Sequence, residues 1–293
     1  MLSFSRNAAI LIFVTVSVLS MGLSGISPPG AGEPLGPVLI SAVGGVSTPV
    51  REAAVDDTPA GKKFAVIIGI VYDNNELGRI KFADRDADSL YDLLTKKLGF
   101  PRQNVILLKN EQATNENIRN ALSWLAENPE IDASSDVVFF YSGHGLRNGE
   151  RGELKVPGLP DGYAMVPFDF QGFDYKNGIG LFFDWYLAEH LSRISPARMW
   201  VTVDSCFSAG FDRPGISGPN RVLTLSSQAN QLSGELHEVN RGVFTHYVID
   251  EGVARGKSVE EAFLASLPGA DHYGQNPHIS DNYPGNLDFS RPR

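Results

Sequence analysis

The stretch that decides the fold is VTVDSCFSAG, residues 201–210, and it contains the only cysteine in the 293-residue sequence. Apolar and β-branched residues lead into it from Met199, a pattern that is typical of a buried β-strand. The strand stops at a small, polar turn that contains glycine. Cys206 is therefore expected at the carboxyl end of a strand, where open α/β sheets place their functional groups.

A second segment of the same design lies upstream. Residues 136–141 (DVVFFY) predict an apolar strand, which is followed by SGHG at 142–145. His144 is expected to take the proton of the Cys206 thiol during attack on a carbonyl and to return it to a leaving amine. The flanking glycines let a substrate backbone come close, and the Gly145 N–H is expected to join that of Cys206 in an oxyanion hole.

Each of these residues has an ordinary structural explanation when it is taken alone. A lone cysteine is usually a small buried hydrophobe, and a histidine in a glycine turn is more often structural. The two strand-end motifs together favour an active site instead. A thiol-dependent redox protein is disfavoured, because the sequence has no second cysteine to complete a disulfide cycle.

The motifs YSGHG (141–145) and DSCFSAG (204–210) resemble those of the caspase-like cysteine peptidases of the metacaspase type. In true caspases the cysteine lies in Gln-Ala-Cys, followed by Arg, Gln or Gly and then Gly. The resemblance runs from about Phe64 to Phe289. It implies an α/β fold, a caspase-like three-layer sandwich with a mainly parallel central sheet and helices on both faces, and it implies a monomer. Weaker matches are FADRDA (82–87), GFP (99–101) and GVFT (242–245).

The resemblance also implies cleavage after Arg or Lys, and the residues around the cysteine agree with that preference. Asp204 lies two residues before Cys206 on the predicted strand, so both side chains are expected on the same face. A carboxylate beside the nucleophile would bind a guanidinium or an ammonium group. By the family pattern, Asp86 and Ser142 complete this substrate pocket. The structural alternatives are a helix N-terminal carboxylate for Asp86 and a hydrogen-bonding partner for Asp204.

Calcium is a candidate cofactor, because many metacaspases bind it through carboxylates. The family has an adjacent acidic pair before the helix that leads to the cysteine strand, whereas this sequence has FFD, with Asp184 alone. Asp212 falls near another expected acidic position. The long loop before that helix supplies weaker candidates, Asp161, Asp169 and Asp174. No metal ligand is therefore assigned and no cofactor is expected to be required, while calcium stays open.

The composition limits the classes of partner. The chain is 42% hydrophobic and 20% charged, as in an ordinary globular protein. Its net charge of −9 argues against nucleic acid or an anionic membrane surface as the main partner. A single cysteine excludes an intrachain disulfide. The expected partners are protein or peptide substrates with basic residues.

The amino terminus predicts export. Arg6 precedes an uncharged apolar run and then small residues, which is the order of a secretory signal peptide over residues 1–25. An uncleaved anchor is the alternative, because no charge appears from Asn7 to Gly32 and about 20 residues can span a bilayer. The rest of the chain is expected to be secreted or periplasmic in the first case, and membrane-anchored but outside the cytoplasm in the second.

The remaining chain divides into a linker and one folded domain. Residues 26–63 are rich in Pro, Gly and Ala and predict a linker or pro-segment. The peptidase domain is expected at 64–293 and opens on the apolar strand 64–70. Alternating strands and helices follow, which predicts right-handed βαβ units and a parallel sheet. The stretch 146–180 predicts a long loop, and the tail from Pro268 predicts irregular chain.

The sequence therefore predicts a cysteine endopeptidase that cleaves after Arg or Lys through a His144–Cys206 dyad. No third catalytic side chain is evident, so a backbone carbonyl is the candidate to orient His144. Two alternatives stay open. One is a cysteine peptidase of the same fold with a different preference at the residue before the cut. The other is a caspase-fold scaffold protein without catalysis, which the presence of both His144 and Cys206 disfavours.

Overall fold

The structure is a computed structural model, and all of the residues that it describes lie in one of the two compact units of the chain, Asp56–Arg293. The predicted signal peptide or anchor (1–25) and nearly all of the predicted linker (26–63) lie outside the described residues. The described ranges are 62–72, 77–150, 152, 154–156, 158–170 and 180–291.

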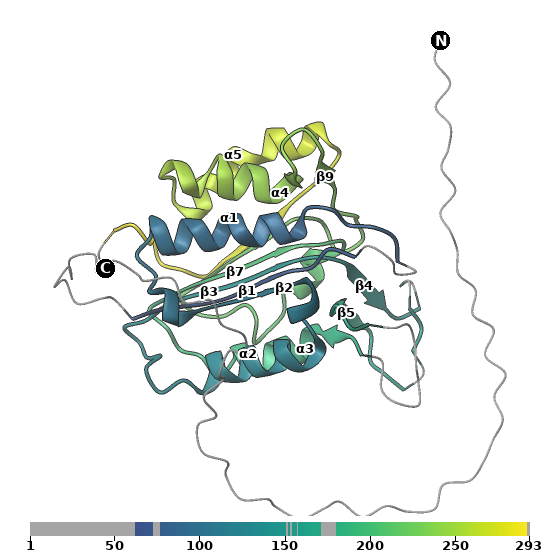
Figure 1. Cartoon of the computed structure of the whole chain (residues 1–293), viewed down its shortest axis with the longest axis horizontal. Helices are drawn as coiled ribbons and strands as arrows, with labels where there is room; N and C mark the ends of the chain where they lie inside the picture. Colours follow the sequence, from purple (N-terminus) through teal and green to yellow (C-terminus); the bar gives the residue numbers. More distant parts are fainter. Residues whose placement is uncertain are drawn as a thin grey trace, which may run out of the picture. The chain divides into compact units, whose positions relative to one another are not determined.

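A six-stranded sheet forms the centre of this unit, in the order β11-β8-β7-β3-β1-β2 (Figure 1). Every neighbouring pair is parallel except β11 and β8, which are antiparallel. The two strands that carry the cysteine and histidine motifs, β7 and β3, are therefore adjacent at the middle of the sheet. The strands are β1 (Lys63–Gly69), β2 (Val105–Lys109), β3 (Asp136–Ser142), β7 (Arg198–Asp204), β8 (Arg221–Leu225) and β11 (His278–Asp281).

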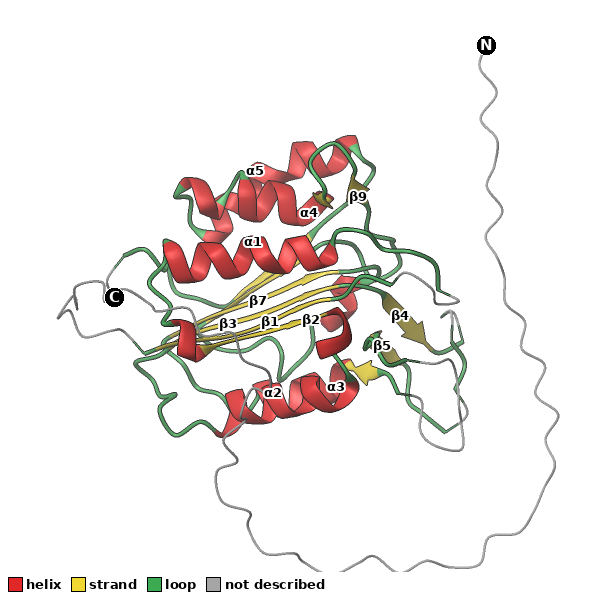
Figure 2. Cartoon of the chain, viewed as in Figure 1, coloured by secondary structure: helices red, strands yellow, loops and turns green. Residues whose placement is uncertain are grey.

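Helices cover both faces of the sheet. Figures 1 and 2 show α1, α4 and α5 on one face and α2 and α3 on the other, which confirms the predicted three-layer α/β sandwich. A π-helical segment (His246–Asp250) and a 3₁₀ turn (Val253–Arg255) continue from α4, and further 3₁₀ turns cover Arg102–Asn104, Asn110–Gln112 and Ser208–Phe211. The α-helices are α1 (Ala83–Lys96), α2 (Asn115–Glu127), α3 (Asp184–Leu191), α4 (Val243–Thr245) and α5 (Val259–His272).

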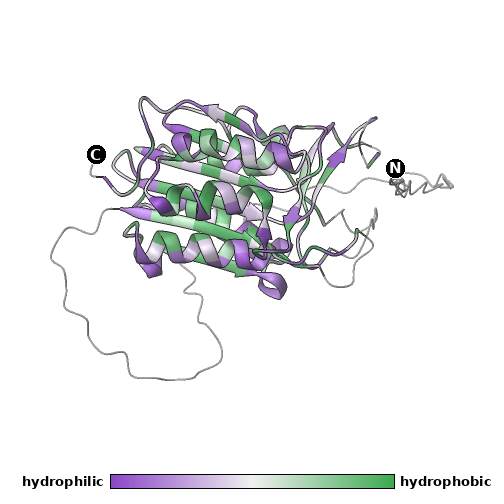
Figure 3. Ribbon diagram, turned by 90° about the horizontal axis from the view of Figure 1, so that it is seen from above, coloured by the Kyte–Doolittle hydropathy of each residue, from purple (hydrophilic) through white to green (hydrophobic). Residues whose placement is uncertain are grey.

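The hydrophobic core lies in two layers, one on each side of the sheet. Successive side chains of a strand point to opposite faces, so β1 divides its apolar residues between the two layers. Val66 and Ile68 pack with residues of α2 and α3, whereas Ala65 and Ile67 pack with residues of α1 and α5. Figure 3 shows the result, with hydrophobic residues along the strands and mixed hydrophilic and hydrophobic residues on the helices.

Helix ends carry the expected capping groups. The Thr114 hydroxyl accepts the Asn117 N–H at 3.2 Å and caps the start of α2. Ser258 and Glu261 form a capping box that begins α5. Within the part of the chain that the structure describes, no helix combines the length and hydropathy that a membrane span requires.

The prediction of an uninterrupted loop at 146–180 was wrong. This stretch contributes most of β4 (Gly145–Asn148) and all of β5 (Gly162–Met165), which form a small antiparallel sheet with β6 (Phe182–Phe183). Such short strands have too few residues to show an alternating pattern, and their pairing is set by contacts across the fold. Residues 171–179 of the predicted loop are outside the described residues.

The prediction of irregular chain from Pro268 onward was also wrong. Helix α5 continues through Pro268 to His272, and the tail then adds β11 to the edge of the sheet. Proline removes one helical hydrogen bond, but Pro268 and Leu264 are exposed, so water can reach the carbonyl that is left. Between β8 and α4, the chain forms a two-stranded antiparallel ribbon of β9 (Glu235–Leu236) and β10 (Arg241–Gly242).

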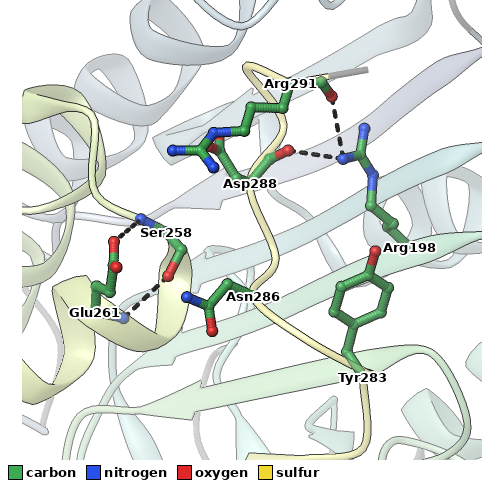
Figure 4. A pocket seen from close by; sticks show the side chains of 7 residues that line it. All are labelled: Arg198, Ser258, Glu261, Tyr283, Asn286, Asp288 and Arg291. Carbon is green, nitrogen blue, oxygen red and sulfur yellow. Dashed lines mark hydrogen bonds and ion pairs between the residues drawn. The ribbon is translucent and has the colours of Figure 1, made fainter. Parts of the chain in front are cut away.

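A buried ion pair joins the amino-terminal ends of the two central strands. Arg198 and Asp136 are register partners, and their side chains form two bonds of 2.9 and 2.7 Å. Arg198 also donates to the carbonyls of Asp288 and Arg291 at the wall of a polar pocket of about 190 Å³ (Figure 4). This pocket lies at the opposite end of β7 from Cys206, and its polar groups largely bind one another.

Candidate active site

The carboxyl ends of β3 and β7 bring the two motifs together. Ser142 and Asp204 are register partners at these ends, so the chain leaves both strands at the same level of the sheet. The Gly143 N–H then donates to the Asp204 carbonyl at 3.2 Å. A Cβ atom at Gly145 would lie 2.0 Å from the Cys206 carbonyl oxygen. The histidine turn and the cysteine turn are therefore in direct contact, and only glycine allows this approach.

Cys206 lies in a turn with a strained backbone. Its thiol is partly exposed, and the Ser233 N–H donates to its Sγ atom at 3.4 Å. The next residue, Phe207, has a φ of 61° in the left-handed region, which costs a non-glycine residue roughly 1–2 kcal/mol. A 2.7 Å bond from the Phe207 N–H to the Gln231 carbonyl helps to hold it there. Strain of this kind is common where a turn must aim a reactive side chain.

Two serines that follow β8 bind the backbone of the cysteine turn. The Ser205 N–H donates to the Ser226 hydroxyl, and the hydroxyls of Ser226 and Ser227 donate to the Ser205 carbonyl, all at 3.0 Å. The Ser208 N–H donates to the Ser227 hydroxyl at 3.2 Å. The backbone is thus fixed on both sides of Cys206. The sequence analysis missed these residues, although paired serines after a strand next to β7 were an available signal.

His144 is oriented by a backbone carbonyl. Its Nε2 atom lies 2.9 Å from the Gly78 carbonyl oxygen, which can only accept a hydrogen bond. Nε2 therefore carries the proton, and Nδ1 of a neutral imidazole is left as a hydrogen-bond acceptor. Burial lowers the pKa of His144 below its ordinary value, and the Gly78 bond opposes this only in part. The lowered pKa favours the neutral form of the imidazole at pH 7.

The three predicted pocket residues also lie together. Ser142 donates to an Asp86 carboxylate oxygen at 2.9 Å, and the Gly242 N–H donates to the other at 3.0 Å. A Cβ atom at Gly242 would lie 2.3 Å from Asp204 Oδ2 and 3.1 Å from Asp86 Oδ2. The two carboxylates thus lie against Gly242, where any side chain would clash with them.

Asp204 is held by residues that the sequence analysis did not single out. Ser233 donates to Asp204 Oδ1 at 2.8 Å, while the Thr245 N–H and hydroxyl donate to Oδ2 at 3.1 and 2.8 Å. Ser233 therefore joins the carboxylate to the thiol, because its own N–H donates to Cys206 Sγ. The pocket lies directly beside the cysteine.

Two acidic side chains are buried side by side in the predicted pocket. Asp86 and Asp204 are only 1% and 5% exposed, and neither forms an ion pair among the described residues. Burial raises the pKa of Asp204, and burial followed by repulsion from Asp204 raises that of Asp86 well above its ordinary value. Arg241, the nearest basic residue to act on Asp86, pairs with Asp250 at 3.0 Å. Two adjacent buried carboxylates with neutral donors are stabilised by an incoming guanidinium or ammonium group.

Both acidic residues make contacts that their structural alternatives describe, and their role in binding substrate stays a prediction. Asp86 lies in the first turn of α1, as its structural alternative requires, but its bonds go to Ser142 and Gly242 from other elements. Asp204 accepts hydrogen bonds from Ser233 and Thr245, as its own structural alternative requires. Gly145 lies against Cys206. The proposed role of the Gly145 and Cys206 N–H groups in an oxyanion hole stays a prediction.

The carboxylates considered for calcium do not fit a calcium site. Asp184 Oδ2 pairs with Arg213 at 2.7 Å, and its Oδ1 accepts the Tyr163 N–H at 3.1 Å. Asp212 pairs with His278 at 2.9 Å. Asp169 accepts a backbone N–H at the start of α2, Asp161 lies against Gly149, and Asp174 falls outside the described residues. Across the described ranges, no group of three or more His, Cys, Asp or Glu side chains is placed to hold a metal ion.

Comparison with known proteins agrees with this architecture. A family model described as the caspase domain matches residues 62–267, most of the chain. The chain belongs to the caspase-domain family. Both central motifs lie inside the matched region.

Curated relatives of this caspase domain are metacaspases. The chain is 32% identical to Metacaspase-3 of Arabidopsis thaliana over 120 residues, which is 39% of this chain and 32% of that protein. It is 32% identical to Metacaspase-1 of the same plant over 210 residues, which is 69% of this chain and 51% of that protein. The chain therefore spans a third to a half of the length of these relatives.

A solved structure shares the fold. Protein GSU0716 from Geobacter sulfurreducens superposes with a TM-score of 0.58 at 17% sequence identity, over 79% of this chain and 97% of that protein. At this identity the likeness concerns the fold alone.

The contact between the two turns generates a stability prediction. A methyl group at residue 145 must push the Cys206 carbonyl away, so Gly145→Ala is expected to lower the free energy of unfolding by about 1–3 kcal/mol. Gly234→Ala is the matched control, because its new Cβ would have only ordinary contacts, at 3.6 Å or more. Urea denaturation measures both. Equal losses in the two variants would contradict the close approach at Gly145.

Proposed function

We propose that this protein is a cysteine endopeptidase that hydrolyses peptide bonds after Arg or Lys. The caspase-domain family supports the reaction class. The observation that carries the basic-residue preference is Ser233, which binds the Asp204 carboxylate through its hydroxyl and Cys206 Sγ through its N–H. A basic side chain bound between Asp204 and Asp86 would leave the next carbonyl carbon beside the thiol.

In the proposed reaction, Cys206 is the nucleophile and His144 the acid–base. Nδ1 of His144 accepts the thiol proton, and the sulfur attacks the carbonyl carbon. The N–H groups of Gly145 and Cys206 donate to the oxyanion of the tetrahedral intermediate. The imidazolium gives its proton to the leaving amine, which departs and leaves a thioester. Water, deprotonated by His144, then hydrolyses the thioester and restores the thiol.

The pocket selects by charge. Asp86 and Asp204 would form charge-assisted hydrogen bonds to a guanidinium or ammonium group, and Ser142 would hold Asp86 in place. An acidic side chain would place a third negative charge in a buried site, which costs several kcal/mol. A same-fold peptidase with another preference would need a differently charged pocket.

Peptide cleavage tests this function. The full chain is expected to cleave a fluorogenic peptide that ends in Arg and not one that ends in Asp, and Cys206→Ala is expected to abolish cleavage. Asp204→Asn is expected to lower kcat/KM for the Arg peptide about 100-fold, from the loss of a buried charge pair. Asp84→Asn is the matched control, because it removes the same charge from α1 outside the pocket.

Each outcome of this assay decides one part of the proposal. Cleavage only after Asp would overturn the pocket and keep the nucleophile. Equal loss in Asp204→Asn and Asp84→Asn would mean that the charge acts from a distance and not by contact. If neither peptide is cleaved, the caspase-fold scaffold is the better account.

We further propose that activity does not require calcium. The two acids nearest to the family's calcium positions already have partners, because Asp184 pairs with Arg213 and Asp212 binds His278. Excess EGTA is therefore expected to change the rate of Arg-peptide cleavage less than about twofold, and added Ca²⁺ is expected to leave the melting temperature unchanged. Activity that appears only with Ca²⁺ would contradict this proposal.

We propose export as the location of this activity, on the evidence of the uncharged apolar segment within residues 1–25. The protein would act as a monomer on protein substrates in the periplasm or outside the cell. Intact-mass measurement of the exported protein is expected to show that these residues have been removed. A full-length protein in the membrane fraction would favour the anchor instead.

A further inference from the structure

Tyr72 lies against His144, and the proposed mechanism gives it no part. It follows β1 by three residues and is 4% exposed. The centroids of its ring and of the His144 imidazole are 4.6 Å apart, with the planes inclined at 43°. Its hydroxyl donates to the Val166 carbonyl and lies 3.4 Å from the Tyr141 hydroxyl.

Tyr141 holds the main chain of the same histidine. Its hydroxyl donates to the His144 carbonyl at 2.7 Å, and the Val166 N–H donates to that carbonyl at 3.3 Å. Burial raises the pKa of both Tyr72 and Tyr141, so each hydroxyl keeps its proton and stays a donor. The backbone of His144 is therefore fixed from one side by Tyr141, while its ring meets Tyr72.

Tyr72 also closes the loop that orients the imidazole. An isolated antiparallel bridge pairs Tyr72 with Ile80, and Gly78 lies between them in the sequence. Gly78 has a φ of 94°, which glycine adopts without strain, and its carbonyl oxygen lies 2.9 Å from His144 Nε2. Tyr72 thus contacts the face of the imidazole. It also pairs with Ile80, close to the Gly78 carbonyl that binds Nε2 of the same ring.

We propose that Tyr72 is a positioning residue for His144, so that its ring and the Gly78 carbonyl together do what a carboxylate side chain does in a catalytic triad. This inference rests on the proposed peptidase function. Among the described residues, no Asp or Glu side chain binds the His144 imidazole. A single carbonyl allows an imidazole to pivot, and the ring contact restricts that rotation. Nδ1 is thereby kept directed away from the loop.

The pKa of His144 depends on the groups that surround its imidazole. Among the described residues, the titratable groups near it include the hydroxyls of Tyr72 and Tyr141 and the Cys206 thiol in the turn that abuts Gly145, and Arg79 follows the Gly78 carbonyl in the sequence. Loss of the Tyr72 ring would admit water to the imidazole and reduce its burial. The pKa of His144 would then rise toward its ordinary value, and a higher pH would be needed to keep the base neutral.

Kinetics of three variants of the full chain test the proposal. Tyr72→Ala is expected to lower kcat for the Arg peptide by about 10- to 100-fold, because a poorly aligned base costs that much, while KM changes less than about threefold. The acid limb of its pH–rate profile is expected to move to higher pH. Tyr72→Phe keeps the ring and is expected to retain kcat within about threefold. Tyr72→Leu keeps apolar volume without the ring and replaces Tyr72→Ala if that variant does not fold.

Phe100→Ala is the matched control for lost packing. Phe100 is 2% exposed and packs against Phe289 in the other core layer. The Phe100→Ala substitution removes a buried ring that does not contact His144. The pH–rate profile of this variant is therefore expected to superpose on that of the unchanged protein. A Tyr72→Ala profile that also superposes, with kcat lowered no more than in Phe100→Ala, would overturn the positioning role.

Nitrogen-15 NMR of the histidine rings gives a readout that needs no peptide cleavage. In the unchanged protein His144 is expected to show one neutral tautomer, with the proton on Nε2, and Tyr72→Phe is expected to keep it. Tyr72→Ala is expected to show a mixture of tautomers. A single Nε2–H tautomer in Tyr72→Ala would reject the inference, whether or not any peptide is cleaved. Failure of the unchanged protein to cleave peptides would count against the proposed function alone.

Discussion

The site depends on one steric constraint, the contact between Gly145 and the Cys206 carbonyl. The two central strands end in register, at Ser142 and Asp204, and each is followed by a turn at the carboxyl end of the sheet. A Cβ atom at residue 145 would lie 2.0 Å from the Cys206 carbonyl oxygen, so the turns can meet only because residue 145 is glycine. The contact places a thiol, an imidazole and two backbone N–H groups together at the carboxyl ends of the two central strands. The serines after β8 then keep the cysteine turn in its strained conformation.

The pocket beside the thiol rests on a second constraint, the burial of two carboxylates side by side. Asp86 comes from α1 and Asp204 from β7, and each is satisfied by hydroxyl and backbone N–H donors and not by a cation. Burial and repulsion from Asp204 raise the pKa of Asp86, and in the proposed function a basic side chain that enters would reduce this cost. Ser233 links Asp204 to Cys206, so in the proposed function substrate recognition and the nucleophile would share one hydrogen-bonded unit.

Much of this arrangement was predictable from the sequence, because it lies in strongly patterned elements. The apolar strands before His144 and Cys206 place both residues at strand ends, and the Thr114 cap marks the start of α2. The groups that the sequence analysis missed come from chain segments without such patterns. Ser233 and Thr245 reach Asp204 from a loop and a short helix, and Gly78 contributes only its carbonyl. Strands β4 and β5 were missed for the same reason, since their pairing is decided by tertiary contacts.

The measurement that tests the central claim most directly is covalent labelling of Cys206 by peptidyl chloromethyl ketones, read by peptide mapping. The account predicts that a label with Arg before the reactive carbon modifies Cys206 and that an otherwise identical label with Asp does not. It also predicts that an arginine mimic such as agmatine slows the reaction. Equal labelling by both reagents, or labelling by the Asp reagent alone, would contradict a pocket that recognises basic side chains beside the nucleophile.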